Sequence, residues 1–244
     1  MREDDVKKQI LLEENYFYFK NKRKLILSVM KNLDFRDVLE IGPGSGVLSR
    51  EIIKIRKAKG KKIDIDCIEI DKEFYRVLKK QKIFRNTYNK NFEEIRIKGK
   101  YDLIILLDVL EHLKNDRQAI KKLNNLNRKN GHLILAVPAY PFLFSYHDKI
   151  AMHYRRYSFK PLRRMLMKNN YEVTKATYFN SFLFPAIFLI RKIFNTKGQE
   201  SDVSKGGFFN RILKILGSIE VFFIRCGIRI PFGTSILIIC RKKK

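Results

Sequence analysis

The sequence contains little cysteine, and the cysteines that it has form no recognisable site. Of 244 residues only three are cysteines, Cys67, Cys226 and Cys240, and they are not spaced as a CxxC pair or as a set of metal ligands. Scattered single cysteines are typical of proteins in reducing compartments. We therefore expect a cytoplasmic protein with no disulfide framework and no bound metal.

Long apolar segments are also absent from the sequence. The most apolar tract, residues 178–190, includes Asn180, Ser181 and Pro185, and it is shorter than the roughly 20 residues that are needed to cross a bilayer. Residues 1–15 carry acidic side chains where a signal peptide carries positive charge. These absences predict that the chain neither spans a membrane nor is secreted, and we find no internal repeat.

Acidic residues are scarce relative to basic ones. Lys and Arg number 52 against 25 Asp and Glu, which gives a formal net charge of +27. Such a charge is typical of chains that bind nucleic acid, anionic lipid headgroups or phosphorylated substrates, and the charge alone does not choose among these partners. A lysine-rich, solvated surface without such a partner is an equally good interpretation.

Apolar runs alternate with amphipathic segments along the chain, as in βαβ units. We expect strands at residues 36–41, 62–70, 101–109, 132–138, 171–179 and 234–242. We expect helices at residues 15–30, 47–58, 71–80, 115–129 and 159–170. Because the strands before residue 139 are apolar throughout rather than alternating, they predict an α/β fold with a parallel sheet that helices cover on both faces.

The stretch VLEIGPGSG, residues 38–46, lies where a predicted strand meets a predicted helix. Its glycines allow a sharp turn and a close approach to a ligand, and the N–H groups of the following helix point toward that ligand. Glu69, at the end of the second strand, has the spacing of a carboxylate that binds ribose hydroxyls. A nucleotide site is therefore expected, with a tight turn that binds nothing as the alternative. A dinucleotide dehydrogenase is disfavoured because Val47 replaces the third glycine of its usual motif.

Together with LLDVLEHLKND (residues 106–116), these segments resemble the class I S-adenosylmethionine-dependent methyltransferases from about Asp37 to the C-terminus. The resemblance implies a Rossmann-like, doubly wound, seven-stranded sheet whose last strand is antiparallel, with an N-terminal cap and a helical insertion before that strand. It also implies S-adenosyl-L-methionine as the cofactor. The tetrapeptide (D/N/S)PP(Y/F/W) of common nucleic-acid amino-methyltransferases is replaced by DVLE, which disfavours methylation of base amino groups.

The resemblance implies a set of cofactor-binding residues. The acidic residue and the glycine loop would hold the methionine part, and Glu69 would bind ribose. Asn91 stands where the family often has Asp beside the adenine, and His112 would follow Glu111 at the start of the next helix. The full set is Glu40, Gly42, Gly44, Gly46, Glu69, Ile70, Asn91, Phe92, Asp108, Val109 and His112.

The loop after the fifth strand, within residues 139–166, is expected to face the acceptor, because ligands bind beyond the carboxyl ends of parallel strands. An acceptor that carries a proton needs a base, for which His147 and His153 are the candidates, with Asp148 orienting one of them. The expected substrate-binding residues are Tyr154, Arg155, Arg156 and Tyr157. Structural packing and ion pairs are the alternative for all of them. The stretch resembles a subgroup of type 11/12-like methyltransferases often found alongside glycosyltransferases.

Residues 180–231 form an addition that a minimal version of this fold does not need. Within it, residues 208–225 place apolar side chains in a broad helical stripe beside Arg211, Lys214 and Arg225. This pattern is typical of an interfacial helix that binds anionic lipid, with a lid or an oligomer contact as the alternative. The polar linker at residues 195–207 is expected to be mobile.

We expect one methyltransferase domain. It comprises an N-terminal helical cap (1–33), a cofactor-binding core (34–138), an acceptor-side loop, helix and strand (139–179), the amphipathic insertion (180–231) and a final strand with a basic tail (232–244). The expected acceptor is a small molecule or a lipid-linked glycan or isoprenoid, methylated by in-line transfer at the inner face of the membrane. RNA is the runner-up acceptor, a cofactor-binding module without catalysis is a further alternative, and the oligomeric state stays open.

Overall fold

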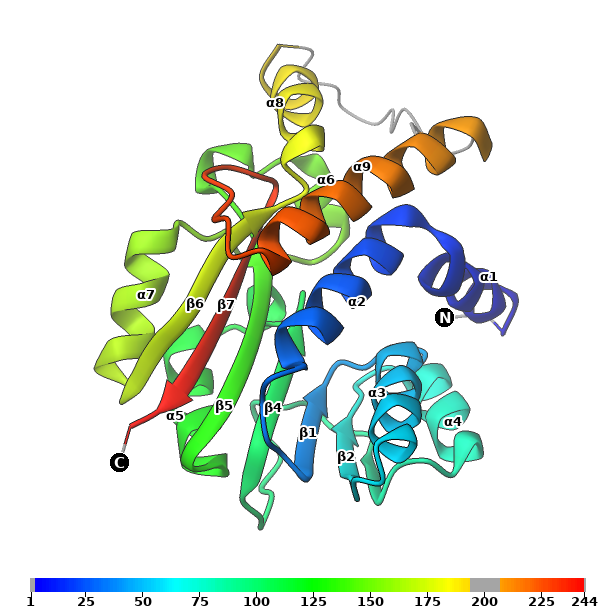
Figure 1. The fold of residues 1–244 in the computed structure, drawn as a ribbon, viewed down its shortest axis with the longest axis vertical. Coiled ribbons are helices and arrows are strands. Elements are labelled where there is room, and N and C mark those ends of the chain that lie inside the picture. Colours follow the sequence, from blue (N-terminus) through cyan, green and yellow to red (C-terminus); the bar gives the residue numbers. More distant parts are fainter. Residues whose placement is uncertain (1–2, 194–206, 244) are drawn as a thin grey trace.

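The computed structural model describes residues 3–193 and 207–243, and Figure 1 shows a central sheet with helices on both faces. The strands are β1 (Asp37–Ile41), β2 (Asp64–Ile68), β3 (Asn86–Tyr88), β4 (Tyr101–Leu107), β5 (Asn127–Pro138), β6 (Tyr171–Phe179) and β7 (Ser235–Lys242). The α-helices are α1 (Glu3–Asn15), α2 (Phe17–Met30), α3 (Val47–Ala58), α4 (Lys72–Gln81), α5 (Asp116–Leu126), α6 (Tyr146–Ile150), α7 (Phe159–Lys168), α8 (Phe184–Ile193) and α9 (Gly207–Arg225). Three short 3₁₀ helices are η1 (Leu110–His112), η2 (Pro141–Leu143) and η3 (Ser181–Leu183).

The strand order confirms the predicted fold class. The seven strands follow the order β3-β2-β1-β4-β5-β7-β6. Strands β1 to β5 pair in parallel, and β7 lies antiparallel to both β5 and β6. The direction of winding reverses between β1 and β4, and in open α/β sheets the carboxyl ends of the strands at this point form the ligand crevice.

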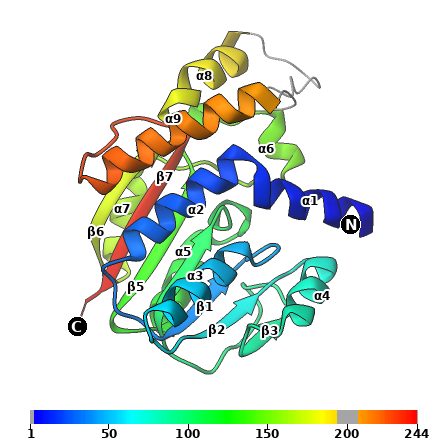
Figure 2. The same ribbon diagram turned by 45° about the vertical axis from the view of Figure 1, so that its right-hand side comes forward.

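Two hydrophobic layers explain why the inner strands are apolar throughout. In β4, Ile104 and Leu106 contribute to one layer with side chains of α5 and α7. Leu103 and Ile105 contribute to the other layer with side chains of α2, α3 and α9. Figure 2 shows α2, α3 and α9 on the near face of the sheet and α5 and α7 behind it. Both faces of β4 are therefore covered, and neither face retains a polar stripe.

Several predicted boundaries differ from the structure: the strand expected at residues 132–138 begins at Asn127, and two further differences concern α5. The helix expected at residues 115–129 ends at Leu126, because β5 already begins at Asn127. The side-chain amide of Asn127 donates a hydrogen bond of 3.0 Å to the carbonyl of His132. The next helix also does not begin at Glu111, since that residue lies in η1, and α5 starts only after Asn115, whose side chain accepts 3.2 Å from the Gln118 N–H.

The N-terminal helices and the insertion pack against each other, and both views show α2 and α9 side by side. The side chain of Asn21 donates a hydrogen bond of 3.2 Å to the carbonyl of Leu213. The N–H of Phe17 donates one of 3.0 Å to the side-chain oxygen of Asn210. A Cβ at Gly217 would collide with Asn21, so only glycine permits this approach. No helix in the described part of the chain has the length and apolarity to cross a membrane. The linker expected at residues 195–207 lies outside the described residues, apart from Gly207.

Candidate active site

The glycine loop between β1 and α3 has a backbone that side chains would disturb. Gly42, Gly44 and Gly46 have φ values of +67°, +57° and +74°, in the left-handed region that favours glycine. A Cβ at Gly42 would lie 2.6 Å from Cγ2 of Val109, which follows β4. The loop therefore packs directly against the residue at which the resemblance places the adenosine.

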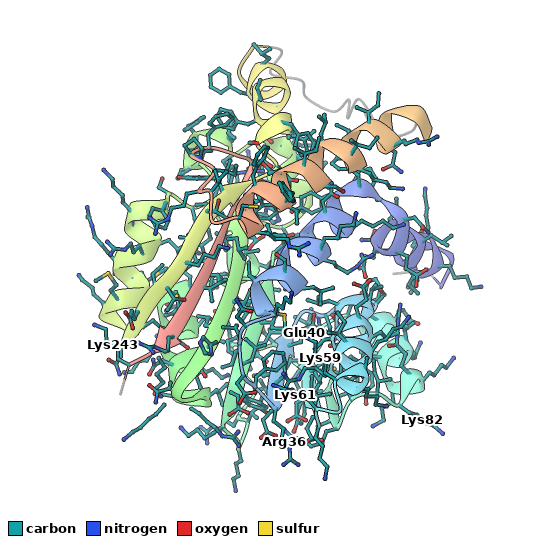
Figure 3. All side chains as sticks on the ribbon, in the orientation of Figure 1. Arg36, Glu40, Lys59, Lys61, Lys82 and Lys243 are labelled. Atoms are coloured by element: carbon teal, nitrogen blue, oxygen red, sulfur yellow. The ribbon has the colours of Figure 1, made fainter. Side chains whose placement is uncertain are left out.

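Two buried carboxylates lie beside this loop. Glu69 accepts hydrogen bonds from the N–H groups of Gly44 at 3.1 Å and Asp71 at 3.0 Å. Glu40 accepts from the hydroxyl of Ser49 on α3, and Figure 3 shows it inside the molecule next to that helix. Burial raises the pKa of each carboxyl to about 7, against a usual value of 4.5. These two groups are acceptors that fit the ribose hydroxyls and the ammonium group of the cofactor.

Side chains of the N-terminal helices contact the same region. The carboxylate of Glu13 accepts from both the backbone N–H, at 2.9 Å, and the hydroxyl of Ser45. Lys22 forms an ion pair with Asp108, and the Tyr18 hydroxyl donates 3.0 Å to the same carboxylate. Burial acts to lower the pKa of Lys22, but the nearby Asp108, Tyr18 and Glu111 together outweigh it and raise that pKa, so the ammonium stays charged. The sequence analysis did not assign Glu13, Tyr18 or Lys22 to the site, because no local pattern marks them.

The residues expected beside ribose and adenine have different environments. Ile70 is 67% exposed, whereas Phe92 is buried beneath the ammonium of Lys122. The side chain of Asn91 accepts 2.9 Å from the N–H of Glu93, so it caps a turn. Their contacts with the cofactor stay predictions.

A second cluster lies after β4, where η1 meets the loop that follows β5. Glu111 is fully buried, and its pKa is raised well above the usual range by burial and by the nearby Asp108. The rings of His112 and His153 stand edge to face, with centroids 4.6 Å apart. The N–H of Tyr154 donates 2.8 Å to the carbonyl of Glu111, which ties the two segments together. No role was predicted for Glu111, although it lies within DVLEH.

The structure brings Asp148 together with His153. Nδ1 of His153 lies 2.9 Å from Oδ1 of Asp148, and Nε of Arg156 donates to the same oxygen at 2.7 Å. The other oxygen of Asp148 accepts 2.9 Å from the N–H of Ser145 and so caps α6. Because Asp148 also pairs with Arg156, it is an ionised acceptor, and His153 must carry its hydrogen on Nδ1. His147, the other predicted base, is exposed on α6.

Three of the four expected substrate-binding side chains form ion pairs or hydrogen bonds within the protein. Arg155 pairs with Asp116 at 3.0 Å, and Arg156 is held by Asp148. Tyr157 is buried, with its hydroxyl 3.2 Å from Asp116. Tyr154 is 57% exposed and is thus the most accessible of the four.

This fold, with a glycine loop after β1 and an acidic residue after β2, defines a class I methyltransferase. A family described as a methyltransferase domain matches residues 13–183, more than two thirds of the sequence. The chain belongs to this family; it is an S-adenosylmethionine-dependent methyltransferase, and S-adenosyl-L-methionine is its cofactor. No curated protein matches the sequence.

Solved structures show the same fold at low sequence identity. The N-methyltransferase NodS from Bradyrhizobium japonicum WM9, in complex with S-adenosyl-L-homocysteine, is 13% identical with a TM-score of 0.57, over 96% of this chain and 91% of that one. The plantazolicin methyltransferase BpumL, also in complex with S-adenosyl-L-homocysteine, is 12% identical with a TM-score of 0.61, over 99% of this chain and 90% of that one. The StiE O-methyltransferase domain is 13% identical with a TM-score of 0.55, over 91% and 74%. Such identities establish the fold and leave the acceptor open.

Proposed function

We propose that this methyltransferase acts on a small-molecule or lipid-linked acceptor, a glycan or isoprenoid intermediate, at an anionic membrane surface. The observation that carries this proposal is the exposed face of α9. Ile215, Ile219 and Phe222 are 55%, 47% and 60% exposed, although an apolar helix face normally packs in the interior. These side chains therefore form a surface that an apolar medium would stabilise.

Basic side chains border this apolar face. An open groove of about 590 Å³ is lined by Ile215, Ile219 and Phe222 together with Lys24, Arg211 and Lys214. Apolar side chains flanked by lysine and arginine are the pattern of helices that lie in the headgroup region of anionic membranes. The charge complements phosphate headgroups, and the apolar residues would enter the acyl boundary.

Further exposed apolar side chains lie beside the acceptor-side loop. Phe188 on α8 is 38% exposed, and its ring lies 6.2 Å from that of Phe142 in η2, which is 48% exposed. Because η2 follows β5 directly, this aromatic pair joins the insertion to the loop expected to hold the acceptor. An acceptor with a lipid chain would thus meet apolar contacts on its path to the site.

The chemical step needs alignment and, for an acceptor with a proton, a base. The cofactor supplies a methyl group on a sulfonium, which is transferred by in-line displacement. His153 is the favoured base: Asp148 accepts its Nδ1–H, which leaves the lone pair on Nε2 to take a proton from a hydroxyl or an ammonium group. Asp148, itself buried, would keep the ring oriented.

Positive charge is also found away from α9. The basic residues labelled in Figure 3, at Arg36, Lys59, Lys61, Lys82 and Lys243, are exposed and lie on several parts of the surface below α9. The net charge of +27 favours RNA as the second candidate acceptor.

One experiment separates these acceptors. The purified protein is incubated with methyl-labelled S-adenosylmethionine and a host extract that contains membranes, and the label is partitioned among organic, nucleic-acid and small-molecule fractions. Label in the organic or small-molecule fraction supports the proposal, and label in RNA overturns it. Absence of label from every fraction favours a cofactor-binding module without catalysis.

A further inference from the structure

Glu111 is a buried carboxyl without a partner. Its relative exposure is 0%, and neither side-chain oxygen has a hydrogen-bond partner within residues 3–193 and 207–243. Leaving such a group unsatisfied costs free energy, and the cost is larger when the group is charged. A buried polar group of this kind calls for an explanation, and a bound cation is one.

Two histidines complete a set of ligand atoms around Glu111. One ligand atom each from Glu111, His112 and His153 lie within 4.8 Å of one another. Zinc holds imidazole nitrogen and carboxylate oxygen at about 2.0–2.2 Å, which puts tetrahedral ligands roughly 3.4 Å apart. The three side chains therefore need to close by at most about 1.4 Å around an ion, an adjustment that side-chain rotations provide.

One of the two histidines, His153, is also held through a hydrogen bond of its ring. Nδ1 of His153 donates to Asp148 at 2.9 Å, which leaves Nε2 with its lone pair. Metal-binding histidines in proteins almost always donate their other N–H to a carboxylate or a carbonyl in this way.

We propose that Glu111, His112 and His153 bind one divalent first-row transition-metal ion. Two imidazoles and one carboxylate favour such an ion over Mg²⁺ or Ca²⁺, which prefer oxygen ligands throughout. The exposed His112 gives the ion access from solvent. Three protein ligands leave coordination positions open, as in catalytic rather than structural metal sites.

The metal site adds to the proposed function. Only the role of the ion in methyl transfer rests on the proposed function. While an ion is bound, His153 is a ligand and no longer the base. An acceptor hydroxyl at an open position would instead lose its proton more readily because the metal polarises it. Binding of the ion requires neither the methyl donor nor the acceptor, so the two proposals can fail separately.

The test uses the full, untagged chain after treatment with a chelator and its removal. Co²⁺ is added while the visible absorption of the ion is recorded, and Zn²⁺ is then added as a competitor. We expect the signal to saturate at one equivalent and Zn²⁺ to displace Co²⁺. Absence of saturable binding by the wild-type protein overturns the proposal without any variant.

Variants then locate the ion. Glu111→Gln preserves the shape of the buried side chain, and His112→Gln changes an exposed one, so at least the second should fold normally by circular dichroism. Each should weaken Co²⁺ binding by more than the roughly 10–100-fold typical of lost supporting contacts. His132→Gln, in the middle of β5 and outside the Glu111 cluster, is the matched control and should bind as the wild type does. If folded His112→Gln binds as tightly as His132→Gln, the ion lies elsewhere and the proposal is wrong.

Discussion

Lys22 of α2 forms an ion pair with Asp108 at the end of β4, although 86 positions separate them in the sequence. The side chain of Lys22 is 8% exposed and that of Asp108 is 26% exposed. Asp108 also has a φ of +54° and accepts a hydrogen bond from Tyr18. Helix α2 is therefore held over the carboxyl ends of the strands by a largely buried ion pair.

Replacement of Lys22 by Met should destabilise the fold. The variant leaves Asp108 without its cation, a change that costs 3–5 kcal/mol for a fully buried pair. Because Asp108 is partly exposed and keeps Tyr18, we expect the free energy of unfolding to fall by about 2 kcal/mol. Urea unfolding measures this change. Lys24→Met, which removes only an exposed hydrogen bond to Ser218, is the control, and equal losses in both variants would contradict the prediction.

Gly42→Ala should weaken binding of S-adenosylmethionine by at least about 10-fold. The new methyl group would displace Val109, which lies where the resemblance places the adenosine, and a loss of only 1.4 kcal/mol corresponds to that factor. Gly60→Ala is the matched control, because Gly60 has a similar φ of +65° and open space around its Cβ position. Both variants should lose about 1–2 kcal/mol of stability through backbone strain. Calorimetric titration that finds the same affinity in both would refute this placement of the site.

Glu40→Gln should change how stability depends on pH. The pKa of Glu40 is about 7 in the folded protein and near 4.5 when the chain is unfolded. Between these values the folded state binds the extra proton, so the free energy of unfolding falls as pH rises and stays low above pH 7. Glutamine still accepts from Ser49 and carries no charge, so the variant should exceed the wild type by on the order of 2–3 kcal/mol at pH 8. At pH 5 the two should be similar. Parallel pH profiles from urea unfolding would argue against the buried, protonated carboxyl.

The double variant Ile219→Ser and Phe222→Ser should bind anionic vesicles at least about 10-fold more weakly, since each side chain contributes roughly 1.5–3 kcal/mol when buried. Sedimentation with vesicles of phosphatidylglycerol and phosphatidylcholine measures the binding, which should also weaken with salt. Ile55→Ser is the control, because Ile55 is 40% exposed on α3 and α2 lies between α3 and α9 in both views. Wild-type protein that stays unbound, or an unaffected double variant, would rule out the membrane surface.

Elements with a clear local pattern were predicted with accurate bounds. The helix at 47–58 and the strand at 171–179 agree with α3 and β6, because the first follows a glycine turn and the second is rich in β-branched and aromatic residues. The helix at 115–129 was too long, since pairing of Asn127 with Tyr101 in the sheet overrides the helical preference of the segment that follows Leu126. Such pairing joins distant segments and leaves no mark in the local sequence.

The sequence by itself determined the βαβ order, the glycine loop and the acidic residue after β2, because turns, apolar runs and strand ends depend on neighbouring residues. Only the tertiary structure decided which distant side chains meet. It placed Lys22 on Asp108, left the side chain of Glu111 buried without a hydrogen bond among the described residues, and set His112 against His153. It also showed that part of the apolar stripe of α9 stays exposed while the rest packs on α2 and the sheet. Burial and charge pairing arise from packing across the whole chain, which a local pattern does not specify.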